Sequence, residues 1–153
     1  MVDPSEPQRS SPAQAIHLQP TALVAVAVGG LAGTAARFGL GRLFPVESGT
    51  WPVTTFTINI AGALLLGILL ESLVRVGPET SWRRAVRLGV GTGALGSFTT
   101  YSALAVDTDL LLRAGDFVAA AAYALGTVLA GLVATGIGVA LGAWLGERRG
   151  AAR

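Results

Sequence analysis

The sequence predicts an all-α integral membrane protein with four transmembrane helices, the third of which is broken. Three observations predict this fold. Hydrophobic residues make up 52% of the 153 residues and charged residues only 13%, about half the charged share of a soluble domain. Four apolar segments of membrane-spanning length follow one another, joined by short polar connections. The third segment combines closely spaced glycines with a run of hydroxyl side chains.

The four apolar segments form a single domain at residues 21–146. They lie at residues 21–41, 53–70, 88–106 and 117–146, with connections at 42–52, 75–87 and 107–116. Each is near or above the roughly 18–20 residues that cross a hydrocarbon core, and we expect helices because lipid offers the backbone no hydrogen-bond partner. We expect a disordered, proline-rich tail at residues 1–20 and a basic tail at residues 147–153.

The distribution of arginines predicts the orientation. One side of the membrane would carry both tails and the second connection, with eight arginines: Arg9, Arg75, Arg83, Arg84, Arg87, Arg148, Arg149 and Arg153. The other side would carry three: Arg37, Arg42 and Arg113. Because basic residues favour the cytoplasmic side, both termini are predicted in the cytoplasm, with the protein in a plasma or inner membrane. So strong a bias also disfavours insertion in both orientations.

The third segment carries the strongest functional signal. Glycines stand at 89, 91, 93 and 96, and hydroxyl side chains at 97, 99, 100, 101 and 102. Backbone broken at this depth is tolerated only inside protein or against a water-filled cavity. Freed carbonyls there can bind a cation, and freed N–H groups or hydroxyls can bind an anion. The alternative is a kinked packing helix whose hydroxyls bond back to the preceding turn.

Three further features have both a functional and a packing interpretation. Asn59, within the second segment, can donate to an anion or bond a neighbouring helix. In the fourth segment, Tyr123, Thr127 and Thr135 form a polar stripe that can donate to an anion or to another helix. Beside that stripe runs a ridge of small residues suited to close helix contact: Gly126, Ala130, Ala134, Gly138, Gly142 and Gly146. Arg37, which ends the first segment, can snorkel to the interface or draw anions toward a vestibule.

Several function classes are disfavoured by what the sequence contains. The arginines form no basic face or stripe, so we expect no nucleic-acid partner, and no nucleophile–base set indicates an enzyme. A small four-helix drug or cation exporter would need a carboxylate deep in a span, and Glu71 lies at a segment end. A haem anchor would need a histidine in a span, and His17 lies in the tail. A purely structural membrane subunit would leave the hydroxyl-rich break unexplained.

Together these pieces resemble the CrcB/Fluc family of fluoride channels over about residues 29–142. The family's first-helix Gly-Ala-x-x-Arg pattern is similar to Gly33 through Arg37, and its second-helix Thr-x-x-x-Asn-x-x-Gly matches Thr55, Asn59 and Gly62. The signature Gly-x-x-Gly-Gly-x-Thr-Thr-Phe-Ser-Thr-Phe corresponds to residues 93–104. The order and spacing of these motifs across four short helices carry the resemblance.

The resemblance implies an antiparallel dimer with two fluoride pores and a structural sodium ion at the dimer centre. Main-chain carbonyls of Gly96 and Thr99 would hold the sodium. Asn59 and the hydroxyls of the break and of the fourth helix would line the pore: Thr100, Tyr101, Ser102, Tyr123, Thr127 and Thr135. Arg37 would have a vestibule or structural role. Lipid and fluoride are thus the expected partners.

The sequence departs from the family signature where two phenylalanines are expected. Tyr101 and Leu104 occupy those positions, Ser97 replaces the second glycine and Ala103 replaces a threonine. Tyr101 keeps an aromatic edge, whereas Leu104 has no ring. An incomplete aromatic pair and the biased arginines together favour a dimer with a second, oppositely oriented homologous subunit. A homodimer is the alternative.

Overall fold

The computed structural model describes residues 20–77 and 80–151, and its regular structure within these ranges is entirely helical. Helices α1 (Pro20–Leu43), α2 (Val53–Arg75) and α6 (Phe117–Ala151) are each long and apolar enough to cross a membrane. Four shorter pieces lie between α2 and α6 and form the third crossing: α3 (Ser81–Val86), η2 (Arg87–Leu95), α4 (Gly96–Phe98) and α5 (Tyr101–Arg113).

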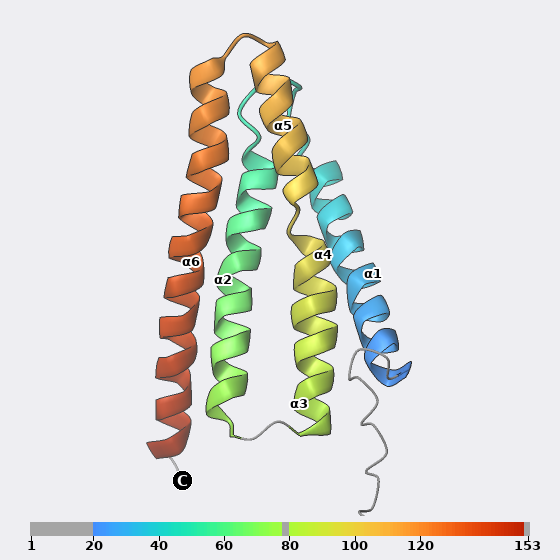
Figure 1. Ribbon diagram of the computed structural model, residues 1–153, viewed down its shortest axis with the longest axis vertical. Helices are drawn as coiled ribbons and strands as arrows, with labels where there is room; N and C mark the ends of the chain where they lie inside the picture. Colours follow the sequence, from blue (N-terminus) through green and yellow to red (C-terminus); the bar gives the residue numbers. More distant parts are fainter. Residues whose placement is uncertain (1–19, 78–79, 152–153) are drawn as a thin grey trace, which may run out of the picture.

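The crossings lie side by side as long rods, in the order α6, α2, the α3–α5 crossing and α1 (Figure 1). The most extensive packing joins α2 to α6 and α1 to η2, and α5 also packs against α6. The start of α1, the end of α2 and the end of α6 lie toward the same end of the bundle (Figure 1). Arg75, at the end of α2, and Arg148, near the end of α6, therefore lie toward one end of the bundle, where Arg75 pairs with Glu147.

The third crossing departs from a regular α-helix in two places. Along η2 the helix is π-helical, and at its end the Gly96 N–H donates to the Gly91 carbonyl, five residues back. After α4, residues Thr99 and Thr100 are extended, with ψ of 153° and 119°, before the chain becomes helical again at Tyr101. π-helical turns are often found at functional sites. The predicted break in the third segment is thus confirmed.

Glycines bring neighbouring helices into backbone contact. A Cβ on Gly93 in η2 would lie 2.7 Å from the Val26 carbonyl oxygen of α1, and one on Gly142 in α6 would lie 2.9 Å from the Ile68 oxygen of α2. The predicted small-residue ridge of the fourth segment is therefore confirmed in its C-terminal half. Gly126, nearer the start of α6, has open space beside it among the described residues.

The main buried cluster lies where α5 meets α6. It consists of Leu104, Leu111, Ala120 and Tyr123, with Phe56 of α2 packed against it. Much of the remaining apolar surface is exposed, including most of α1 and the outer face of α6. Such surface is suited to lipid or to a second subunit.

The predicted segments agree with the observed helices, apart from their ends. We expected a polar connection at residues 107–116, but α5 continues to Arg113. Asp109 and Arg113, one turn apart, form an ion pair of 2.7 Å that supports this extension. The predicted tail at 1–20 lies outside the described residues except for Pro20, and α6 continues through residues 147–151 of the predicted basic tail.

Candidate functional site

Asn59 holds the break in the third crossing through two hydrogen bonds to one residue. The Thr100 N–H donates to Asn59 Oδ1 at 2.8 Å, and Asn59 Nδ2 donates to the Thr100 carbonyl at 3.1 Å. Both backbone groups of an extended residue are thereby satisfied inside the bundle, where water is scarce. An amide nitrogen carries two hydrogens, so Nδ2 retains one N–H beyond the clamp. The structure therefore places Asn59 at the break, where both polar atoms of its amide bond the Thr100 backbone.

The same geometry frees carbonyls on either side of the break. A continuous α-helix would pair the Gly96 carbonyl with the Thr100 N–H, which donates to Asn59 instead. It would pair the Thr99 carbonyl with the Ala103 N–H, which donates to Thr100 Oγ1 at 3.1 Å as a helix N-cap. Both carbonyls thus lose their helical partners. Carbonyls without helical partners at a broken membrane helix are the groups that can coordinate a cation.

Arg37 also binds the break. Its Nε donates to the Ser97 carbonyl at 3.1 Å, in the last turn before the extended residues. The side chain therefore reaches inward to protein rather than only toward the interface. A cation near the C-terminal end of a helix is favourable electrostatically, so Arg37 stabilises the short helix α4 and places a positive charge beside the break.

Arg37 and Arg42 line one cavity together with three threonine hydroxyls. The cavity has a volume of about 270 Å³ and lies between α1, α2 and the start of α5, lined by Arg37, Phe38, Gly41, Arg42, Thr54, Thr55, Ile58, Thr100 and Ala103. Positive charge and hydroxyl donors attract and solvate a small anion. This arrangement fits the vestibule interpretation of Arg37, and it adds Arg42, Thr54 and Thr55, which the sequence did not single out as site residues.

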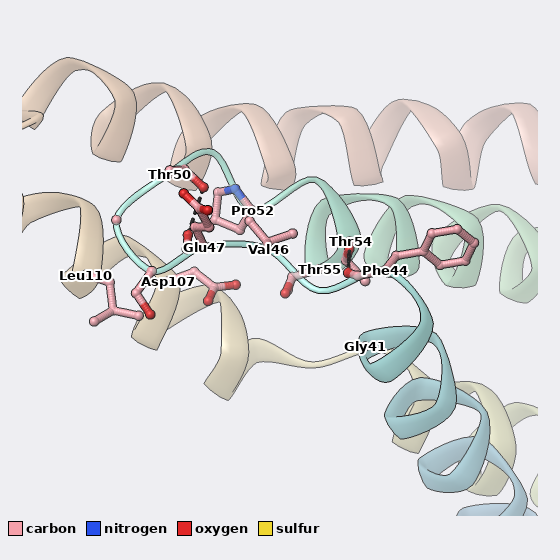
Figure 2. A pocket seen from close by; sticks show the side chains of 12 residues that line it. Gly41, Phe44, Val46, Glu47, Thr50, Pro52, Thr54, Thr55, Asp107 and Leu110 are labelled. Atoms are coloured by element: carbon pink, nitrogen blue, oxygen red, sulfur yellow. Dashed lines mark hydrogen bonds between the residues drawn. The ribbon is translucent and has the colours of Figure 1, made fainter.

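A second cavity, of about 200 Å³, opens beneath the α1–α2 connection and carries acidic groups. Figure 2 shows the Asp107 carboxylate and the Thr55 hydroxyl on facing elements at this cavity, with Glu47 above them in the connection. Thr55 lines both cavities. The basic and acidic cavities therefore meet at the start of α2, and Asp107, which we expected in a wet connection, faces this space from α5.

The polar stripe of α6 begins at this acidic cavity. Tyr123 is fully buried, and its hydroxyl donates to Asp107 Oδ2 at 3.2 Å. Its ring packs edge-on against Trp51, with 5.6 Å between centroids. Thr127 Oγ1 donates to the Tyr123 carbonyl and Thr135 Oγ1 to the Gly131 carbonyl, at 2.6 and 2.9 Å. In this structure the two threonine hydroxyls thus bond back to their own helix.

Tyr101 and Leu104 have opposite environments. Tyr101 is 82% exposed, so its ring points out of the subunit, whereas Leu104 is buried against the α5–α6 cluster. Ser102 Oγ lies 3.1 Å from Thr100 Oγ1 and joins the break. The structure therefore brings Arg37, Asn59, Thr100 and Ser102 together at the break. Tyr123 and Thr127 lie along α6, and Thr135 lies lower, against Gly67 of α2.

Comparison with known proteins agrees with this architecture. Residues 24–139 match the family described as CrcB-like protein, Camphor Resistance (CrcB). The chain is 47% identical over 133 residues to "Fluoride-specific ion channel FluC 3" of Streptomyces avermitilis, covering 87% of this chain and 64% of that protein. It is 49% identical over 135 residues to "Fluoride-specific ion channel FluC 2" of Leifsonia xyli, covering 88% and 92%. It is 38% identical over 125 residues to "Fluoride-specific ion channel FluC" of Chloroflexus aurantiacus, covering 81% and 97%.

The matched region includes most of α1, all of α2, the whole broken third crossing and most of α6. Family and fold therefore agree over the same residues, and the chain belongs to the CrcB-like protein family.

Proposed function

We propose that this chain is a subunit of a fluoride-selective ion channel that lowers cytoplasmic fluoride by passive efflux. The observation that carries the proposal is the similarity, at 47% and 49% identity, to proteins named fluoride-specific ion channels. The basic, hydroxyl-lined cavity beside a broken membrane helix supports it independently. No catalytic turnover is needed for this task, so the protein acts as a channel and not as an enzyme.

Passive efflux follows from the acid–base chemistry of fluoride. HF is a weak acid that crosses lipid as a neutral molecule and dissociates inside the cell, where the anion is trapped. A channel lets that anion leave down the membrane potential. With the cytoplasm 100 mV negative, the potential favours exit of a single negative charge by about 2.3 kcal/mol.

Selectivity for fluoride would come from small neutral donors that replace its hydration shell. Arg37 and Arg42 draw anions to the cavity, and the free N–H of Asn59 and the hydroxyls of Thr100 and Ser102 lie beside it. In this proposal Tyr101, Tyr123, Thr127 and Thr135 continue the route. The two α6 threonines would turn their hydroxyl hydrogens from the helix backbone toward the passing ion. Neutral donors bind weakly enough to release it.

The working unit in this proposal is an antiparallel dimer. One subunit exposes large apolar faces on α1 and α6, and in this proposal a second subunit covers them and completes the ion path. The outward-pointing Tyr101, 82% exposed, would line the path against the second subunit. In this proposal the arginine bias orients this chain with both termini on the cytoplasmic side of a plasma or inner membrane, so the partner would be a distinct homologous subunit of opposite orientation. A homodimer is the alternative.

A structural sodium ion fits the break. The Gly96 and Thr99 carbonyls, which have lost their helical partners, would hold it, since sodium takes oxygen ligands of this type. Arg37 bonds the Ser97 carbonyl and leaves those of Gly96 and Thr99 to the ion. The ion would join the broken segments of two subunits, so assembly would depend on Na⁺. Dimer stability measured by size-exclusion chromatography in Na⁺ and in a large organic cation tests this, and equal stability in both would contradict it.

Growth tests the proposed function in cells. The chain, expressed alone and with a homologous partner, is expected to restore growth on fluoride to a bacterium that lacks its own fluoride exporter. Restoration by the chain alone would favour the homodimer, and restoration only by the pair would favour the heterodimer. Fluoride sensitivity that neither expression relieves, with both proteins in the membrane, would contradict the proposal.

A further inference from the structure

A second feature lies at the arginine-rich end of the bundle, far from the break. A groove of about 440 Å³ runs between the end of α2 and the start of the third crossing, lined by Leu70, Leu73, Val74, Gly77, Arg83 and Arg87. Leu73 and Val74 lie three and four residues after Leu70 on α2 and so share a helix face with it. The groove is apolar along α2 and charged at its outer end.

Arg83 lies at that charged end with two donors unpaired. Its Nε and Nη1 are buried from solvent and have no hydrogen-bond acceptor among the described residues, and a hypothetical Cβ on Gly77 would lie 3.8 Å from Nη1. The two described carboxylates at this end, Glu71 and Glu147, both contact Arg75. A guanidinium stays charged in proteins, and leaving its donors unpaired is costly. An anionic acceptor reached by a turn of the side chain would relieve that cost.

The groove lies at the depth of lipid headgroups. Trp82, beside Arg83, is 57% exposed, and its ring lies 5.7 Å from the Arg83 guanidinium. Trp144 on α6, toward the same end of the bundle, is 47% exposed. Exposed tryptophans gather at the boundary between hydrocarbon and headgroups. The charged end of the groove is therefore at headgroup level, and Leu70 lies deeper, toward the acyl chains.

We propose that this groove binds an anionic phospholipid, whose phosphate pairs with Arg83 and Arg87 and whose acyl chain lies along Leu70, Leu73 and Val74. Charge and shape both favour this occupant. The cationic end of the groove lies at headgroup level, where a lipid carries its phosphate, and the apolar end lies deeper, where a lipid carries its acyl chains. Basic pockets between membrane helices bind such headgroups. The bound lipid would fasten the end of α2 to the start of the third crossing, and would favour the orientation that places this end in the anionic leaflet.

Native mass spectrometry of the full chain in detergent tests the proposal. Delipidated protein is titrated with phosphatidylglycerol or phosphatidylcholine of identical acyl chains. We expect phosphatidylglycerol to bind about tenfold more tightly, because both lipids carry the phosphate but the arginines repel the choline cation of phosphatidylcholine. Arg83→Gln is expected to remove that preference. Arg148→Gln, which changes an arginine at the same end that stacks on Trp144 at 3.8 Å, is expected to keep it.

Two further measurements distinguish binding of a whole lipid from binding of an inorganic anion. Leu73→Trp fills the groove and is expected to weaken binding of both lipids, whereas Leu65→Trp, at a 48% exposed position of the same helix, is expected to leave it unchanged. Inorganic phosphate at millimolar concentration is expected not to displace phosphatidylglycerol. Equal binding of the two lipids, a preference that survives Arg83→Gln, or displacement by phosphate would each overturn the proposal. Circular dichroism verifies that every variant is folded.

Discussion

Replacing Asn59 with leucine tests the role of the clamp at the helix break. Leucine has the same branched side-chain skeleton as asparagine, with methyl groups in place of the amide oxygen and nitrogen, so it keeps the shape but has no polar atoms. The change removes both bonds to Thr100, of 2.8 and 3.1 Å, and leaves that residue's N–H and carbonyl without partners in a part-buried site. No other described side chain donates to or accepts from the Thr100 backbone in this structure.

The magnitude follows from those two backbone groups. Each buried polar group left unsatisfied costs about 1–2 kcal/mol, so the expected loss of stability is about 2–4 kcal/mol. At about 2–4 °C per kcal/mol for a chain of this size, the melting temperature should fall by roughly 4–16 °C. Fluoride flux should fall as well, because the break also carries Thr100 and Ser102.

The assay combines thermal unfolding in detergent, followed by circular dichroism, with fluoride efflux from liposomes. Thr57→Val is the matched control, since Thr57 is exposed two residues earlier on the same helix, and it should change neither quantity. A pore-lining role alone would lower flux at unchanged melting temperature. Asn59→Leu with wild-type melting temperature would therefore refute the clamp.

Three more substitutions test separate parts of the fold. Gly33→Ala should destabilise the subunit by about 1–3 kcal/mol, because the added Cβ would overlap the Ala94 carbonyl, while Gly39→Ala, in open space, should be neutral in the same melt. Thr100→Val should cost about 1 kcal/mol through loss of the α5 N-cap, and Thr100→Ser should restore most of it. Tyr123→Phe should cost about 1 kcal/mol by removing the bond to Asp107, and an unchanged melting temperature would show that this bond contributes nothing.

The sequence predicted the spans and the break because both are local properties. An apolar run of membrane length is visible without tertiary structure, and the glycines before Thr99 and Thr100 signal a weak helix. The clamp was not predictable, since Asn59 and Thr100 are 41 residues apart and only folding brings them together. The sequence left open whether Asn59 would donate to an anion or bond a neighbouring helix, and did not indicate that its partner would be the broken backbone itself.

The predicted end of the third helix at residue 106 was wrong, because it was based on charged residues. Asp107 and Asp109 suggested a wet connection, but α5 continues past them because a helix can leave the lipid and still satisfy its backbone. The hydrogen bond from Arg113 to Asp109 and the charge of that carboxylate raise the pKa of Arg113. Leu104 illustrates a similar limit, since its burial against Tyr123 and Leu111 depends on contacts between helices that the sequence pattern does not show.

Fluoride efflux from proteoliposomes, recorded with a fluoride-selective electrode, tests the central claim most directly. Liposomes loaded with fluoride and containing the assembled dimer should release it when a potassium gradient and valinomycin allow compensating charge movement. The same vesicles loaded with chloride, and followed with a chloride-selective electrode, should release almost none. Arg37→Gln should slow fluoride release, whereas Arg113→Gln, at an exposed arginine outside both cavities, should not. Selective, protein-dependent fluoride release is the predicted result, and equal release of chloride and fluoride, or none above protein-free liposomes, would contradict the account.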